Sequence, residues 1–290
     1  MAVPVYAQGA NGAQLVAHLR GVYDGWRKAM VRKDARSWQR FTSNTKKIKI
    51  RNRLWSDRKV FPNAVFEAPL APPDISPLTL VAAQAKGRTA KLTYFGKVDL
   101  GIGGKPTENL FVISYEQEGA VWKYHGGEFV NLSALPEVRK QIAAGNKKFL
   151  EGKDFVPSGV VETPPAVVRA PVKYVAKAYV FCPGREVKLL VNKTSRHLFQ
   201  NTKRADVVIG GAKDGINELQ FTVKDIPGGN PNAPITIRMY LMSEVKGQKP
   251  PKPIEYQIDE EQAKKGMKPK TSGTLTFNLD QEMAKKLGGR

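Results

Sequence analysis

Cysteine is nearly absent from this sequence, whose 290 residues include a single one, Cys182. One thiol cannot form an intrachain disulfide, nor can it supply the cysteine set of a structural zinc or iron–sulfur site. Histidine is also scarce, because His18, His125 and His197 are the only three and none falls in a metal-binding spacing. We therefore predict that the chain uses neither a metal ion nor a cofactor.

Acidic residues are few, and long hydrophobic runs are missing. The chain has 26 Asp and Glu against 47 Lys and Arg, so its formal net charge is +21. A chain with this charge is attracted to polyanions and to anionic surfaces. No apolar run approaches the roughly 20 residues of a membrane-spanning helix, so we expect no transmembrane segment.

The hydrophobic content of 41% is high enough for a buried core. The length suits one large domain or two domains of roughly 100–150 residues each. Near the start, Val5-Tyr6-Ala7 followed by Gln8 is similar to the small-residue end of a secretory signal. Two interpretations stay open: residues 1–11 are a disordered start left from a signal peptide, or they are an apolar cytosolic N-terminus.

A Pro-rich stretch over 155–171 divides the chain, because its prolines exclude helices and central strands. We interpret it as a linker between a mixed domain at 12–154 and an all-β domain at 172–290 with a short C-terminal helix. The predicted fold class is therefore an α+β domain, with helices packed on a curved antiparallel sheet, followed by a β-sandwich.

In the first half, apolar residues from Leu15 to Met30 recur every three or four positions, which predicts a long amphipathic helix. Asp34 is a candidate N-cap for a second helix that ends near Phe41. The pattern over 45–55 fits either a strand or a third helix. Further expected elements are strands over 78–85, 89–98 and 109–117, a fourth strand formed by 120–124 together with 129–130, and a helix over 137–150.

This order of helices and hairpins resembles the NTF2-like (SnoaL and ketosteroid isomerase-like) cone fold over about 12–132. The residues that carry the resemblance are Tyr23 and Trp26 in the first helix, the Arg32-Lys33-Asp34 junction, and the strands at 87–96 and 121–124. These signals describe a fold and no particular chemistry, since one fold hosts enzymes and binding modules alike.

The resemblance implies a pocket inside the cone, where enzymes of the family place carboxylates and a tyrosine. Five polar residues on or beside the predicted strands are therefore pocket candidates: Tyr94, Asp99, Tyr115, Glu116 and His125. None of them aligns with the family's catalytic pattern. We therefore predict a binding or structural pocket and no catalytic residue, although an enzyme is the alternative.

The second half contains seven short segments with strand character, at 174–181, 187–191, 205–209, 218–223, 235–242, 254–258 and 274–279. Their number and spacing resemble an immunoglobulin-like sandwich over about 172–280. The Cys…Trp…Cys core of antibody domains is absent from this sequence.

Positive charge is concentrated in residues 20–59, which hold 14 Lys or Arg and three Asp. These cations could bind the phosphates of a nucleic acid without sequence specificity, and Trp26, Trp38 and Trp55 could stack on bases. The alternative is an ordinary solvated helix face. The candidate residues are Arg27, Arg32, Lys33, Arg40, Lys46, Lys47, Lys49, Arg51, Arg53 and Trp55.

These observations favour a non-catalytic, exported module of the cell envelope, periplasmic or extracellular, whose partner is an envelope protein or an anionic glycan. One alternative is a cytoplasmic polyanion-binding protein that uses the segment 20–59. The other is a small-molecule isomerase or hydratase that works inside the cone. The sequence does not determine the oligomeric state.

Overall fold

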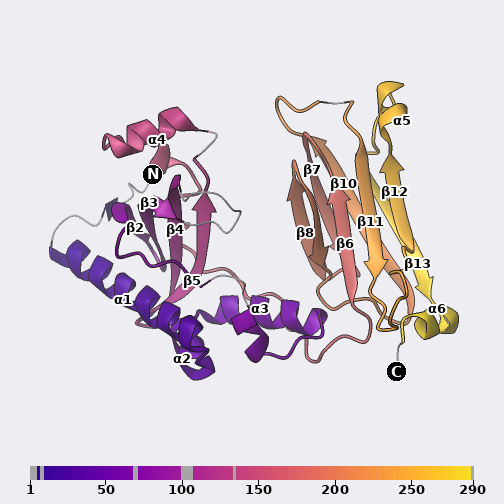
Figure 1. Ribbon diagram of the computed structural model, residues 1–290, viewed down its shortest axis with the longest axis horizontal. Coiled ribbons are helices and arrows are strands. Elements are labelled where there is room, and N and C mark those ends of the chain that lie inside the picture. The colour runs from indigo at the N-terminus through magenta and orange to yellow at the C-terminus, as the bar shows by residue number, and fades with distance from the viewer. Residues whose placement is uncertain are drawn as a thin grey trace. The chain divides into compact units, whose positions relative to one another are not determined.

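The structure is a computed structural model that describes residues 5–6, 10–67, 71–98, 107–132, 135–230 and 232–288. After the two-residue strand β1 (Val5–Tyr6), helices come first along the chain and the other strands of three antiparallel sheets follow, so the protein belongs to the mixed α+β class (Figure 1). The chain forms two compact units. The first comprises Met1–Lys49 and Pro62–Pro165, and the second comprises Ile50–Phe61 and Ala166–Arg290.

The helical part of the first unit starts with α1 (Ala10–Arg32) and α2 (Ala35–Phe41). The Asp34 carboxylate accepts a hydrogen bond from the Ser37 amide, which confirms the predicted N-cap of α2. The ambiguous stretch after Phe41 is a helix, α3 (Asn44–Ser56). Ser43 caps it, because its hydroxyl accepts a hydrogen bond from the Lys46 amide.

A five-stranded antiparallel sheet follows in the order β1-β2-β3-β4-β5. Its strands are β1 (Val5–Tyr6), β2 (Thr79–Lys86), β3 (Thr89–Val98), β4 (Thr107–Glu118) and β5 (Val121–Val130). Residues of α1 share a hydrophobic cluster with one face of this sheet. The opposite face packs against Ile142, Leu150 and Phe155, so β4 is buried on both sides.

Two short 3-10 helices, η1 (Asn63–Glu67) and η2 (Lys148–Glu151), and one α-helix, α4 (Pro136–Ala143), complete the first unit. The predicted helix over 137–150 is therefore wrong in its second half. Gly145 adopts a positive φ of 85°, and the Asn146 amide donates to the carbonyl of Gln141 at 2.8 Å. This left-handed turn ends α4 early.

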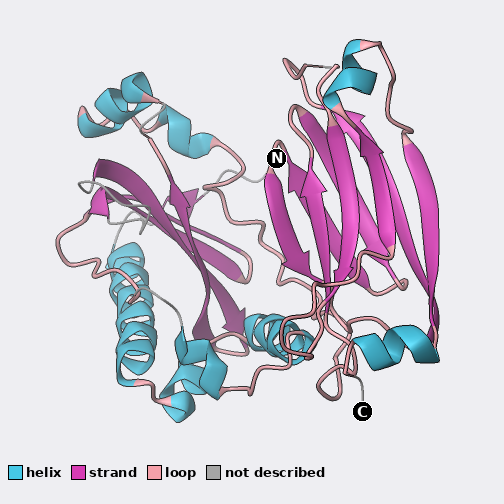
Figure 2. Ribbon diagram, turned by 45° about the vertical axis from the view of Figure 1, so that its right-hand side comes forward, coloured by secondary structure: helices cyan, strands magenta, loops and turns pink. Residues whose placement is uncertain are grey.

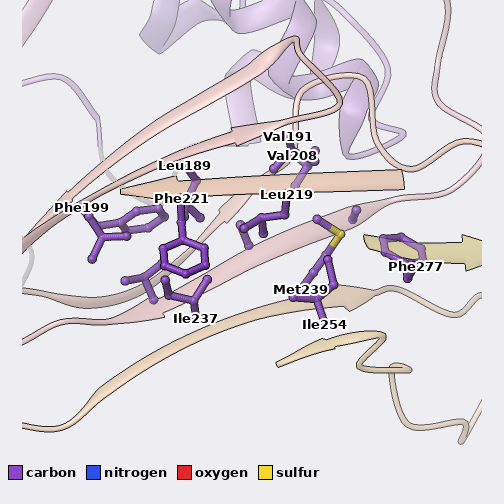
Figure 3. Packing of buried hydrophobic residues seen from close by; sticks show 14 of the residues in the cluster. Leu189, Val191, Phe199, Val208, Leu219, Phe221, Ile237, Met239, Ile254 and Phe277 are labelled. Carbon is purple, nitrogen blue, oxygen red and sulfur yellow. The ribbon is translucent and has the colours of Figure 1, made fainter. Parts of the chain in front are cut away.

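The second unit contains two four-stranded sheets that share one hydrophobic core. One sheet has the order β13-β10-β7-β8 and the other β12-β11-β6-β9. Figure 2 shows the two layers of strands, and Figure 3 shows Leu189, Phe221 and Ile237 packed among the core residues between them. The strands are β6 (Ala176–Phe181), β7 (Arg185–Val191), β8 (Ser195–Gln200), β9 (Lys203–Val207), β10 (Gly215–Asp225), β11 (Ile235–Leu241), β12 (Ile254–Ile258) and β13 (Ser272–Leu279), with α5 (Glu260–Lys264) and α6 (Gln281–Lys286) beside them.

All seven strands expected in the second half are present, and β8 is an additional strand that the sequence analysis missed. Inner and outer residues alternate strictly along β7, where Val187, Leu189 and Val191 are buried. The stretch 155–171 contains no helix or strand. One boundary between the two compact units falls inside it, after Pro165, but Ile50–Phe61 also belongs to the second unit, so the predicted division at this stretch alone is incomplete.

The packing of α1 on α2 gives a first prediction. A Cβ at Gly25 would lie 2.4 Å from the ring of Phe41, whereas a Cβ at Gly21 would meet nothing within 4 Å. Gly21→Ala should raise the free energy of unfolding by about 1 kcal/mol, because alanine favours the helix. Gly25→Ala should instead lower the free energy of unfolding by about 1–3 kcal/mol relative to wild type. The new methyl group forces the ring of Phe41 to move, and this cost outweighs the gain in helix propensity.

Denaturant unfolding of both variants would measure this difference. The double variant Gly25→Ala/Phe41→Leu, with a smaller side chain at position 41, should recover part of the loss. Equal stabilities of the two single variants would show that Phe41 does not pack on Gly25.

Candidate functional site

Two of the predicted pocket residues, Tyr94 on β3 and Tyr115 on β4, lie in the cluster between the first sheet and α1. Both are buried, together with Tyr23 of α1 and Tyr124 of β5. Tyr23 Oη donates a hydrogen bond to the carbonyl of Pro73 at 2.8 Å. The hydroxyls of Tyr94 and Tyr115 have no hydrogen-bond partner within the part of the chain that the structure describes.

Burial raises the pKa of Tyr94, of Tyr115 and of Tyr124, because the ionised phenolate is poorly solvated there. All three hydroxyls therefore stay protonated near neutral pH. They can donate a hydrogen bond to a small polar ligand, but they cannot serve as the general base that isomerase chemistry needs.

Two further pocket candidates, Glu116 and His125, meet each other at the start of α3. His125 Nδ1 lies 3.2 Å from a carboxylate oxygen of Glu116 and 2.9 Å from the hydroxyl of Ser43. Burial raises the pKa of Glu116, but the neighbouring His125 and Ser43 side chains outweigh burial and hold that pKa below its ordinary value. Glu116 is thus a buried carboxylate that stays ionised.

This arrangement is not a catalytic relay. A relay needs the hydroxyl and the carboxylate on different ring nitrogens, whereas Ser43 and Glu116 both approach Nδ1 of His125. The Ser43 amide also donates to the carbonyl of Tyr124 at 2.8 Å. The cluster therefore ties the start of α3 to β5.

The five pocket candidates do not form one site. Neighbouring residues on a strand point to opposite faces, so Glu116 lies on the face of β4 that Tyr115 does not. On β5, His125 is the unpaired residue of a β-bulge next to Tyr124, and its ring nitrogen Nδ1 lies 3.2 Å from Glu116. Asp99 lies outside the described residues.

Several cations of the basic segment already have partners. The guanidinium of Arg27 donates to the carbonyl of Pro72 at 3.0 Å and lies 3.6 Å from the Asp74 carboxylate. Lys49 forms an ion pair with Glu162, and the Arg51 guanidinium lies 5.1 Å above the ring of Trp55. Lys46 and Lys47 are half-buried on α3.

The remaining polyanion candidates, Arg32, Lys33, Arg40 and Arg53, are exposed. Arg51, Arg53 and Trp55 belong to the second compact unit, and the other seven candidates belong to the first. Trp38 is buried at 1% exposure, so it cannot stack on a base as the sequence suggested.

A second cluster of serine, histidine and carboxylate, which the sequence analysis missed, lies at the edge of the β13-β10-β7-β8 sheet. Ser195 Oγ lies 2.7 Å from His197 Nε2, and His197 Nδ1 lies 3.7 Å from a carboxylate oxygen of Asp206. Burial lowers the pKa of His197, although Asp206 opposes this effect. The atoms are in the order of a hydrolase triad.

The position of Ser195 makes this cluster structural. The residue is 0% exposed, and its hydroxyl accepts a hydrogen bond from the Ile209 amide at 2.7 Å. A substrate carbonyl therefore has no access to the oxygen. The sequence signal was the Ser-x-His spacing, which places both side chains on one face of a strand.

The outer face of the same sheet carries a trough of about 640 Å³. Strand register places its outward-facing residues in two adjacent rows across the four strands. Hydroxyl and amide groups occupy β13 and β10, and cations and leucines occupy β7 and β8. The first row is Ser272, Thr222, Lys188 and Leu198, and the second is Thr274, Gln220, Leu190 and Arg196.

Lys188 lies 3.3 Å from Glu186, so its charge is partly balanced. Arg196 is exposed and has no ion pair with any residue that the structure describes. The trough therefore combines a cation, an apolar floor and hydrogen-bonding side chains on one rigid sheet face. None of its residues was singled out from the sequence, because β8 was not recognised as a strand.

No cluster of three or more potential metal ligands occurs among the residues described. Cys182 is buried, and burial raises the pKa of its thiol, so the thiol is a poor nucleophile. Within the described ranges, no helix is both long and apolar enough to cross a bilayer. No family model, curated protein or solved structure matches this chain.

The buried carboxylate of Glu116 gives a second prediction. Glu116→Gln should lower the free energy of unfolding at neutral pH by about 1–3 kcal/mol, because the carboxylate loses its charge and with it the attraction of the neighbouring His125 and Ser43 side chains. The folded-state pKa lies below the unfolded one, so this stabilisation is present above the unfolded value and disappears as pH falls through the folded value.

Denaturant unfolding at several pH values would test this difference, with Glu128→Gln as the control because Glu128 is exposed on the neighbouring strand. If the free energies of unfolding of Glu116→Gln and wild type differed by the same amount at neutral and at acid pH, the charge of Glu116 would not stabilise the fold.

Proposed function

We propose that this chain is a non-catalytic binding module of the cell envelope, and that the trough on the β13-β10-β7-β8 sheet binds an anionic glycan. The two side-chain rows of the trough carry this proposal. Arg196 and Lys188 can bind a carboxylate or sulfate, while Thr222, Gln220 and Thr274 can bind sugar hydroxyls. Leu190 and Leu198 offer apolar surfaces to the C–H faces of sugar rings.

The net charge supports both the ligand class and the location. A charge of +21 draws the protein towards the anionic polymers and headgroups of an envelope. Diffuse attraction alone is weak and sensitive to salt. The hydrogen-bonding side chains of the trough are held in fixed positions by the sheet, and they would add selectivity for one kind of anionic ligand to the electrostatic attraction.

The buried state of the polar clusters favours binding over catalysis. Glu116 and His125 hold α3 to β5, and Ser195 is enclosed beside His197. An isomerase or hydratase would need one of these groups to reach a substrate and exchange protons with it.

The proposal also keeps both fold resemblances. Three helices followed by an antiparallel sheet, with α1 on one face, agree with the helix and strand order of the NTF2-like cone. Two four-stranded sheets around one core agree with a sandwich of immunoglobulin-like architecture.

A third prediction tests the trough. Calorimetry should detect binding of an oligogalacturonate, and a neutral maltooligosaccharide of equal length should bind much more weakly. Arg196→Gln should weaken oligogalacturonate binding about tenfold, the scale of one charge-assisted hydrogen bond. Lys224→Gln is the matched control, because Lys224 is exposed on β10 of the same sheet but does not line the trough.

Equal weakening by Arg196→Gln and Lys224→Gln would show that binding follows net charge rather than the trough. Absence of any acidic glycan binding would reject the ligand class.

The α1–α2 junction favours a second candidate function, polyanion binding in the cytoplasm. Arg32, Lys33, Arg36 and Arg40 are exposed there, and no ion pair joins them to an acidic residue in the described ranges. The Asp34 carboxylate between them is occupied by the cap of α2. These cations are the part of the basic segment that phosphates could reach.

A fourth prediction separates this candidate from diffuse attraction. Changing Arg32, Lys33, Arg36 and Arg40 to Gln should weaken duplex DNA binding. The slope of the logarithm of the binding constant against the logarithm of the salt concentration should become shallower by about 0.9 for each phosphate that the variant no longer binds. The control changes Lys246, Lys249, Lys264 and Lys285 to Gln, which removes the same charge from exposed sites of the second unit. Equal slopes in the two variants would reject a site at the junction.

A further inference from the structure

Strand β13 is a free edge of its sheet and carries no charged residue. It pairs with β10 along eight residues, from Ser272 opposite Thr222 to Leu279 opposite Gly215. On its other side it has no strand partner within the described part of the chain. A long, uncharged edge strand is a template for pairing with another strand.

One hydrogen bond shows which backbone groups of β13 point towards β10 and which point away from the sheet. The Val223 amide of β10 donates to the Thr271 carbonyl at 2.8 Å, so this residue pair is a hydrogen-bonded pair of the ladder. Hydrogen-bonded pairs alternate along an antiparallel ladder. Residues 273, 275, 277 and 279 therefore face β10, and the backbone groups of 272, 274, 276 and 278 point away from the sheet.

The other edges of the two sandwich sheets are protected. Strand β8 carries Arg196, and the outward carbonyl of Leu198 accepts a hydrogen bond from Arg204 at 2.8 Å. Strand β9 carries Lys203, Arg204 and Asp206 in five residues. Strand β12 is equally short, contains Glu255 and follows a Pro-rich stretch. Charges, short length and prolines are the usual protections of an edge.

We infer that β13 pairs antiparallel with β13 of a second copy of this chain, centred on Leu275, and joins two four-stranded sheets into one of eight strands. In this register Ser272 faces Asn278 of the other copy and Thr274 faces Thr276, all with outward backbone groups. Gly273 faces Phe277, and Leu275 faces its own copy.

Self-pairing suits this strand better than a charged partner would. Every cross-strand pair is neutral, and threonine pairs and glycine–aromatic pairs stabilise antiparallel ladders. The charge of +21 on each copy opposes association through long-range repulsion. Added salt screens this repulsion, so dimerisation should strengthen as salt rises, opposite to polyanion binding.

Sedimentation equilibrium of the full chain tests the inference directly. Wild type should form a dimer whose dissociation constant falls with added salt. Hydrogen exchange should slow at the amides of 272, 274, 276 and 278 as protein concentration rises. A chain that stays monomeric at high concentration and high salt would overturn the inference. Protection of the same amides by an extended peptide from another protein would not rescue it, because the proposed partner is a second copy of this chain.

Charge substitutions test the register. Thr274→Lys/Thr276→Lys places lysine opposite lysine twice and should weaken the dimer about tenfold. Thr274→Lys/Thr276→Glu places lysine opposite glutamate twice and should keep the dimer at least as tight as wild type. Both positions are exposed, so unfolding curves serve to verify the fold. A dimer unaffected by the first double variant would use another surface, and one weakened equally by both would not be centred on Leu275.

This inference does not depend on the proposed glycan site. Loss of oligogalacturonate binding in Arg196→Gln with an unchanged dimer would concern the trough alone. Loss of the dimer in Thr274→Lys/Thr276→Lys concerns the edge strand.

Discussion

The alternation of inward-facing and outward-facing residues along β7 and β10 determines most of what the second unit offers to a partner. Leu219 and Phe221 of β10 (Figure 3), and Val223 after them, must face inward, because the two sheets stabilise each other through their shared core. The residues between them are then fixed on the outer face. Gln220 and Thr222 reach the trough as a consequence of core packing, and a one-residue slip of β10 would remove them from it.

The first unit is subject to a different constraint, because its strand β4 is buried on both faces. Phe111, Ile113 and Tyr115 of β4 pack towards α1, while Leu110 and Val112 pack towards the opposite cluster. Polar residues in such a strand must find partners inside the protein. Glu116 lies 3.2 Å from His125, whose ring contacts Ser43, so residues predicted as pocket candidates serve to join elements here.

The elements predicted correctly are those with a strong local signal. The helix that contains Leu15–Met30 and the Asp34 cap depend on spacing and on a side chain next to its acceptor, both visible in sequence. Strand β8 was missed because its outer positions, among them Arg196 and Leu198, give no clear alternation. The helix–strand ambiguity over 45–55 was settled by Ser43, whose cap is a local signal that competing periodicity obscured.

The candidate sites could not be predicted from local sequence patterns, because they arise from strand pairing between segments that are distant in the sequence. The trough brings Lys188 and Ser272 into one row, although 84 positions separate them in sequence. The free edge of β13 is likewise a property of the sheet, since it depends on which strand is last in the order. Strand β13 therefore combines three roles that its sequence alone does not separate: Phe277 and Leu279 complete the core, Ser272 and Thr274 line the trough, and the outward backbone groups remain available for pairing.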